Sequence, residues 1–93
     1  MREKEVEKVL VNQVKERGGL AVKFVSPGFD GVPDRLLLFQ NGAACFVEVK
    51  APGKKLRPLQ ELRARQLRAL GFSVYVIDNK EMIGGILDEI CST

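Results

Sequence analysis

The chain of 93 residues is 45% hydrophobic and 29% charged, and its formal net charge is +3. This length is enough for one hydrophobic core, so we expect a single domain over residues 1–93. The chain has no histidine, which excludes Ser-His and Cys-His catalysis and the usual zinc sites, and its two cysteines, Cys45 and Cys91, are too few for a disulfide framework. The charged N-terminus and the lack of a long apolar run predict a cytoplasmic protein without a membrane partner.

The first half of the chain predicts a helix followed by three strands. Apolar residues at helical spacing indicate a helix over residues 3–17, which Gly18-Gly19 ends. The apolar run at residues 20–25 predicts a strand, and residues 26–33, rich in proline and glycine, predict a loop. Residues 34–39 and 44–50 predict two more strands joined by a hairpin turn at residues 40–43.

The second half predicts a helix, a strand and a last helix. A basic loop leads into a helix that begins at Pro58 and ends at Gly71, and residues 72–77 are rich in β-branched and aromatic side chains. Residues 80–91 predict the last helix, which Gly84-Gly85 weakens. The order αβββαβα, with a parallel crossover from residue 44 to residue 77, predicts an α/β fold with a mixed four-stranded sheet flanked by helices.

Two charged residues interrupt the apolar strand at residues 44–50. The spacing of Glu48 and Lys50 places both side chains on one face of the sheet, while Val47 and Val49 point toward the core on the other. Burying a carboxylate or an ammonium is costly unless the charge is paired or ligates a metal. The alternative is an exposed ion pair, which contributes little to stability.

The length of the hairpin turn decides whether Asp34 joins these residues. A two-residue turn at Asn41-Gly42 would pair Asp34 with Val49 and place its side chain on the wrong face. A three-residue turn over residues 40–42 sets Asp34 opposite Glu48, and Gly42 suits the left-handed position that such a turn requires. We therefore predict the three-residue turn, or another odd offset. The competing acid, Asp30, lies between glycines and is interpreted as a turn residue.

Two carboxylates with Cβ atoms about 5 Å apart can share a divalent cation. Such a cation neutralises a phosphate and lowers the pKa of a bound water, and Lys50 can orient that water or stabilise the leaving oxygen. The carbonyl of Val49 could add a further ligand, and hard oxygen ligands indicate Mg²⁺ or Mn²⁺. Asp34, Glu48 and Lys50 thus predict phosphodiester hydrolysis, with one or two metal ions.

Basic residues gather between residues 50 and 68, with Glu61 as the lone acid. A surface of this kind suits a phosphate backbone, although a solvated helix face has the same composition. We expect Lys54, Lys55 and Arg57 to contact DNA without sequence preference. Lys23 could touch a phosphate too, or extend its chain along an apolar surface.

Val32-Pro33-Asp34 followed by Glu48-Val49-Lys50 resembles the signature of the PD-(D/E)XK nuclease superfamily. Within that superfamily, the chain is similar to the VRR-NUC family over most of its length. The matching segments are Lys23-Phe24, Gly31-Val32-Pro33-Asp34-Arg35, Phe46-Val47-Glu48-Val49-Lys50-Ala51-Pro52-Gly53, Leu56-Arg57-Pro58-Leu59-Gln60, Leu70-Gly71-Phe72 and Val74-Tyr75-Val76-Ile77. One triplet arises easily by chance, whereas this ordered set is specific.

The resemblance implies a restriction-endonuclease-like core and activity on branched or flapped DNA. Stand-alone members, often from phages, are similar to Holliday junction resolvases that act as homodimers, which implies action in the host cytoplasm. The family also has an acid in the first helix and a glutamine after the EXK strand. By position these are Glu7 and Gln60. Glu3, one turn earlier, is the alternative to Glu7, which we prefer because it lies between Val6 and Leu10. Gln60 could instead face solvent.

Two hypotheses follow for function. The first is a metal-dependent, structure-specific DNA endonuclease that resolves four-way (Holliday) junctions as a homodimer, or that cuts flaps or other branches. A dimer would supply two symmetric cuts, and we expect its interface at the apolar C-terminal helix or the loop at residues 26–32. The second is a DNA-binding module without catalysis, which would not require the three charged residues.

Overall fold

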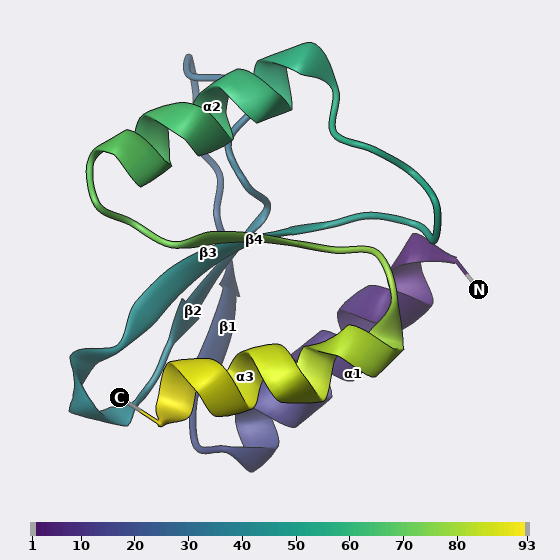
Figure 1. Ribbon diagram of the computed structural model, residues 1–93, viewed down its shortest axis with the longest axis vertical. Coiled ribbons are helices and arrows are strands. Elements are labelled where there is room, and N and C mark those ends of the chain that lie inside the picture. Colours follow the sequence, from purple (N-terminus) through teal and green to yellow (C-terminus); the bar gives the residue numbers. More distant parts are fainter. Residues whose placement is uncertain (1, 93) are drawn as a thin grey trace.

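The computed structural model describes residues 2–92. A sheet of four strands in the spatial order β1-β2-β3-β4 forms the middle of the protein (Figure 1). The elements in chain order are α1 (Glu3–Glu16), β1 (Leu20–Lys23), β2 (Arg35–Leu38), β3 (Ala44–Val49), α2 (Pro58–Ala69), β4 (Val74–Ile77) and α3 (Ile83–Cys91), with short 3-10 turns at Gln40–Gly42 and Lys80–Met82. The first two strand pairs are antiparallel and β3 pairs with β4 in parallel, so the predicted mixed α/β sheet is confirmed.

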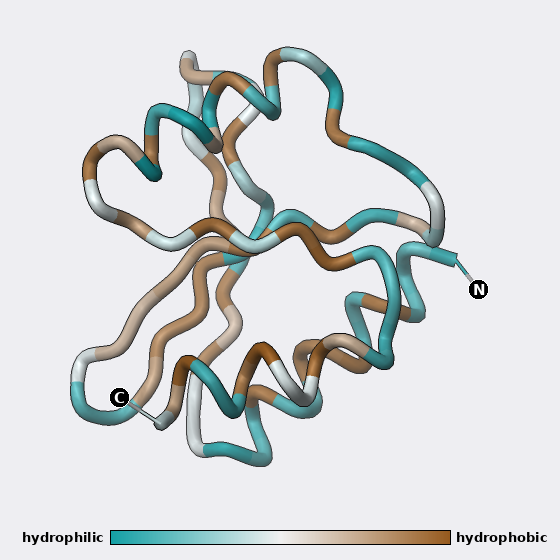
Figure 2. Tube along the Cα trace, viewed as in Figure 1, coloured by the Kyte–Doolittle hydropathy of each residue, from teal (hydrophilic) through white to brown (hydrophobic). Residues whose placement is uncertain are grey.

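The helices form two layers on opposite faces of the sheet (Figure 1). The α1 and α3 helices pack on one face, and the main core lies between them and the strands; its fully buried side chains include Val6, Leu10, Val14, Leu37, Val47, Val49, Ile77, Ile83 and Leu87. The α2 helix lies on the other face, where Ala64 is its one buried residue. Figure 2 shows hydrophobic residues concentrated along the strands, with a mainly hydrophilic segment between β3 and α2.

The turn between β2 and β3 has the predicted three residues. Leu38 pairs with Ala44, and the N–H of Phe39 donates to the carbonyl of Ala43 at 2.9 Å, which leaves residues 40–42 as the turn. Gly42 has φ +82°, as the left-handed position requires. Arg35 pairs with Val47, so the same register continued by one step sets Asp34 opposite Glu48. The predicted turn is confirmed, and with it the register on which the site depends.

The C-terminal helix differs from the prediction in what its apolar face contacts. Gly84-Gly85 does not prevent the helix, because Ile83, Leu87 and Ile90 bury their side chains in the core beside α1. This face is therefore not free to form the dimer interface that we expected there. Within residues 2–92, no helix combines the length and the hydropathy that a membrane span needs.

Candidate active site

Asp34 and Glu48 form the centre of the candidate site, on the face of the sheet that carries α2. Glu48 is only 5% exposed, near the end of β3, where it pairs with Val76 on β4 and lies opposite Asp34 on the other side. Its Oε2 atom is buried and has no hydrogen-bond partner among the described residues. The N–H of Val49 donates to Asp34 Oδ1 at 3.2 Å, which fixes the second carboxylate beside β3. A carboxylate oxygen without a partner in a buried site requires a cation or a proton.

The pKa values of the two carboxylates also indicate that the site requires a cation or a proton. The pKa of Glu48 is raised from 4.5 to about 7; burial is the largest cause and the negative charge of Asp34 the second, while Lys50 lowers it by less. Burial also raises the pKa of Asp34, against the N–H of Val49, and the charges of Glu7 and Glu3 add to the rise. The protein therefore brings acidic groups together, and the positive charge of Lys50 offsets only part of their effect on Glu48.

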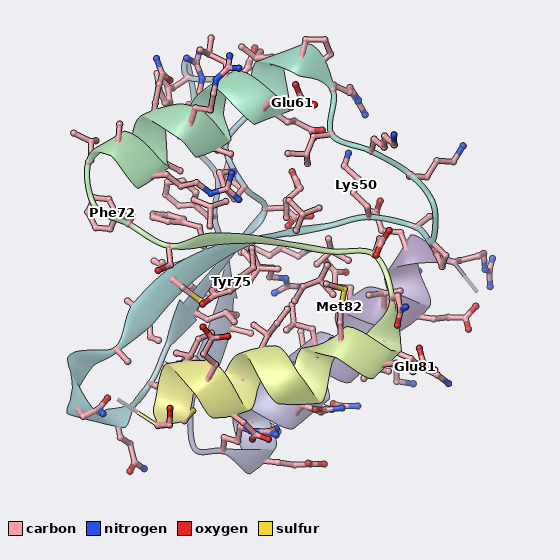
Figure 3. All side chains as sticks on the ribbon, in the orientation of Figure 1. Lys50, Glu61, Phe72, Tyr75, Glu81 and Met82 are labelled. Carbon is pink, nitrogen blue, oxygen red and sulfur yellow. The ribbon has the colours of Figure 1, made fainter. Side chains whose placement is uncertain are left out.

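Lys50 follows β3 and lies on the α2 side of the sheet, beside the segment that leads into α2 (Figure 3). It is 8% exposed, and its N–H donates to the carbonyl of Ile77 at 2.9 Å, which holds the backbone at the end of the strand. Within residues 2–92, no carboxylate lies close enough to form an ion pair with its ammonium group. The alternative of an exposed Glu48–Lys50 pair is therefore wrong, because both residues are buried and they are not paired.

These three residues open into a cleft of about 590 Å³. Its other walls come from the loop before β2, the segment before α2 and the first turns of two helices, and include Glu3, Asp30, Gly31, Arg57, Leu59 and Gln60. Gly31 brings the loop against α2: its φ is +87°, and a Cβ atom there would lie 2.7 Å from the Cγ of Leu59. Asp30 thus lines the cleft, although its carbonyl accepts a hydrogen bond from Arg63 at 2.7 Å as part of the loop.

Gln60 lines the cleft and also caps a helix. Its Oε1 accepts from the N–H of Arg57 at 2.9 Å, as the third residue of a capping box at the start of α2. The cap uses the oxygen and leaves the amide NH₂ group as the part available to a substrate. The expected role of Gln60 in the site stays a prediction.

Glu3 and Glu7, the two acids considered in the first helix, have different surroundings. Glu3 lines the cleft with Asp34 and Glu48, whereas Glu7 is absent from its lining and pairs with Arg35 at 3.2 Å. The position of Glu7 between Val6 and Leu10 does not bring it into the cleft, since it directs the side chain toward β2. Within residues 2–92, no three Asp, Glu or Cys side chains are close enough to hold a metal by themselves.

The residues predicted to bind DNA lie at different distances from the cleft. Arg57 lines it, and Lys54 and Lys55 are exposed in the same segment before α2. Lys23 is exposed on β1 at the edge of the sheet. The role of all four in binding DNA stays a prediction.

Two arginines that the sequence analysis did not single out organise the site. Arg63 holds the loop before β2 through Asp30 and stacks over the ring of Phe29 at 3.8 Å. Arg35 is buried at the start of β2, on the face opposite Asp34. A charge in an apolar strand was the signal that identified Glu48, and the same signal was present for Arg35.

A family model described as the VRR-NUC domain matches residues 2–81 of this chain. The chain belongs to the VRR-NUC family. It is 50% identical over 82 residues, or 88% of each chain, to "Putative nuclease p44" of Acyrthosiphon pisum secondary endosymbiont phage 1. A solved structure described as a VRR_NUC domain superposes with a TM-score of 0.86 at 28% identity, over 92% of this chain and 94% of that one. The expected family and fold are thus confirmed, and the protein is a member of a nuclease family.

The residues of this VRR-NUC domain fit a divalent cation. Glu48 offers a buried oxygen without a partner, and Asp34 is held opposite it on the neighbouring strand. Glu3 lies in the wall of the same cleft, although no three carboxylates within residues 2–92 are close enough to hold a metal by themselves. Carboxylate oxygens, together with a backbone carbonyl such as that of Val49, are the donors that Mg²⁺ and Mn²⁺ prefer.

Proposed function

We propose that this VRR-NUC protein is a metal-dependent endonuclease that hydrolyses phosphodiester bonds in branched DNA, with the four-way junction as its substrate. One observation carries the proposal. The register of β2 and β3 sets Asp34 opposite Glu48, and Glu48 keeps an oxygen that is buried and unpartnered beside Lys50. A DNA-binding module without catalysis has no use for this arrangement, because burying these charges costs stability and contributes nothing to backbone binding.

Each residue of the site has its own role in the proposed reaction. Asp34 and Glu48, with the carbonyl of Val49 and a carboxylate of α1, would hold Mg²⁺ or Mn²⁺. When bound, the ion would supply positive charge to the scissile phosphate and lower the pKa of a water molecule. Lys50 places an ammonium group at the same cleft, where it can orient the attacking water or stabilise the leaving oxygen. Gln60 has an amide NH₂ group that can donate to the phosphate.

The basic residues of the cleft rim support DNA as the substrate. Arg57 in the cleft and Lys54 and Lys55 beside it would neutralise phosphates on the way to Asp34 and Glu48, with Lys23 contacting a more distant part of the backbone. Binding of this kind is independent of sequence and weakens as salt rises. Selection by the shape of the DNA is therefore the mode that the site favours.

An apolar face supports a homodimer. On the α2 side of the sheet, Leu20 is 62% exposed, and Val22 and Leu38 are exposed beside it on β1 and β2. Phe72, 52% exposed, lies after α2 (Figure 3). A second copy would cover this face, and the open edge of β1 would allow a twofold arrangement. Two copies would supply the two cuts that a four-way junction requires.

We expect the protein to sediment as a dimer and the double variant Leu20→Ser/Val22→Ser to sediment as a monomer. The substitutions remove apolar area that a partner would bury, whereas Val25→Ser, an exposed valine outside this face, should leave the dimer unchanged. Analytical ultracentrifugation measures both. A monomeric wild type, or a double variant that dimerises as the wild type does, would contradict this interface.

The function is tested with a labelled four-way junction, a flap and a plain duplex of the same sequence, each with Mg²⁺, Mn²⁺ or EDTA. We expect cleavage of the junction with either metal, none with EDTA, and little on the duplex. Preferred cleavage of the flap would keep the nuclease and change its substrate. Binding of the junction without cleavage under any metal would favour the non-catalytic module instead.

A further inference from the structure

Arg35 joins three elements from a buried position directly after Asp34. Its guanidinium donates to the carbonyl of Ala21 on β1 at 3.0 Å and pairs with Glu7 of α1 at 3.2 Å, while its own backbone is part of β2. The residue is 9% exposed, and it lies on the α1 side of the sheet because it pairs with Val47. One side chain thus connects the strand that begins directly after Asp34 to the helix that carries Glu3.

The pair is a poor means of stabilising the fold. Arg35 Nε is buried and has no hydrogen-bond partner among the described residues, so part of its desolvation is not offset. Buried ion pairs are often no more stabilising than apolar side chains of the same volume. The contribution of this pair is therefore to position α1, because the contact between the two charged side chains holds the helix at a defined distance from β2.

The first turn of α1 has few other contacts to hold it. Arg2, Glu3, Lys4 and Glu5 are all exposed, and the ion pair between Arg2 and Glu5 at 3.7 Å lies within the helix itself. Exposed pairs of this kind contribute little. The first anchors of the helix to the sheet are Val6, in the core, and Glu7, on Arg35. Because Glu3 and Glu7 are one turn apart on the same stripe of the helix, holding Glu7 sets the place of Glu3.

On these grounds, and resting on the proposed function, we propose that Arg35 and Glu7 are positioning residues that hold the first turn of α1 so that Glu3 contributes the helix carboxylate of the metal site. Glu3 lines the cleft with Asp34 and Glu48, and Glu7 does not. The two acids therefore have different roles. Glu3 would bind the metal, and Glu7 binds Arg35, which holds the helix in place.

The first test compares Glu3→Gln, Glu7→Gln and the control Glu5→Gln in direct titrations with Mn²⁺. Glutamine at position 7 keeps an oxygen that can accept from Arg35, so its Mn²⁺ affinity should stay within about threefold of the wild type. Glu3→Gln should lower the affinity by roughly tenfold or more, and Glu5→Gln should not change it. A larger loss in Glu7→Gln than in Glu3→Gln would overturn the assignment.

The second test needs neither metal nor cleavage. The variant Arg35→Met/Glu7→Leu removes the pair without leaving a buried charge, and we expect it to fold. In EDTA, the amides of residues 7–9, which close the first turn of α1, should exchange with solvent about tenfold faster, with Val14 unchanged and Glu7→Gln close to the wild type. Unchanged exchange at residues 7–9 would overturn the proposal.

If the double variant fails to fold, Glu7→Gln and Arg35→Lys replace it. Lysine cannot reproduce the two contacts of the arginine side chain, so we expect fast exchange at residues 7–9 in Arg35→Lys and slow exchange in Glu7→Gln. Slow exchange in Arg35→Lys with fast exchange in Glu7→Gln would overturn the proposal. A wild type that does not bind Mn²⁺ would instead contradict the proposed function.

Discussion

The variant Glu48→Gln is expected to cleave a four-way junction on the order of 10³ times more slowly than the wild type, with junction affinity in EDTA within about threefold. Glutamine keeps the size and the acceptor oxygen of the side chain but removes the charge that would hold the cation. Since Glu48 is buried in β3 and is not one of the exposed residues that would contact the DNA backbone, replacing it with a neutral side chain of the same size should leave those contacts in place.

The measurement pairs single-turnover cleavage with a binding titration on the same junction. Glu61→Gln is a matched control: it removes an exposed acid at the start of α2 without changing the Asp34–Glu48 pair (Figure 3). Asp34→Asn and Lys50→Met should lose cleavage in the same way. A Glu48→Gln protein that still cuts at a tenth of the wild-type rate would show that the reaction does not depend on this carboxylate.

The same substitution should stabilise the metal-free protein near neutral pH. The pKa of Glu48 is about 7 in the folded protein and 4.5 as its ordinary value, so the folded state binds more protons between these two values. Stability therefore falls as the pH rises through that window. From about pH 5 to about pH 7.5, the contribution of Glu48 to the free energy of unfolding should fall by about 2 kcal/mol.

Urea unfolding in EDTA at these two pH values measures the effect. We expect the wild type to lose stability with rising pH relative to Glu48→Gln, which should be the more stable of the two at pH 7.5. Asp34 adds to the trend in both proteins, because its pKa is also raised. Equal pH dependence in the two proteins would mean that the carboxylate is better solvated than its position in β3 indicates. Adding Mn²⁺ should restore stability to the wild type more than to the variant.

The sequence was sufficient to predict the elements that local rules control. Glycines and prolines mark the ends of helices, and the charged Glu48 and Lys50 are conspicuous in an apolar strand, so the sheet and the central residues of the site could be predicted. Even the register could be predicted, because only a turn with an odd number of residues brings Asp34 and Glu48 to the same face.

What could not be predicted depends on the angle at which α1 crosses the sheet. Glu3 and Glu7 lie on one stripe of the helix, and no local rule says which of them reaches the end of β3. That choice depends on how Val6, Leu10 and Val14 pack against the strands and on the contact between Glu7 and Arg35. The apolar face of α3, one of the two expected dimer interfaces, was misjudged for a similar reason, because it is buried in the core of its own chain.

The length of the turn at the far tip of the hairpin decides whether Asp34 and Glu48 face each other. Adding or removing one residue in the turn, with both strands still paired, would turn Asp34 away from Glu48 without changing any residue of the cleft. Changes by two residues would preserve the alignment. We therefore expect the length of this turn to differ among relatives by even numbers of residues, and a relative whose turn differs by one residue should lack the facing pair of carboxylates.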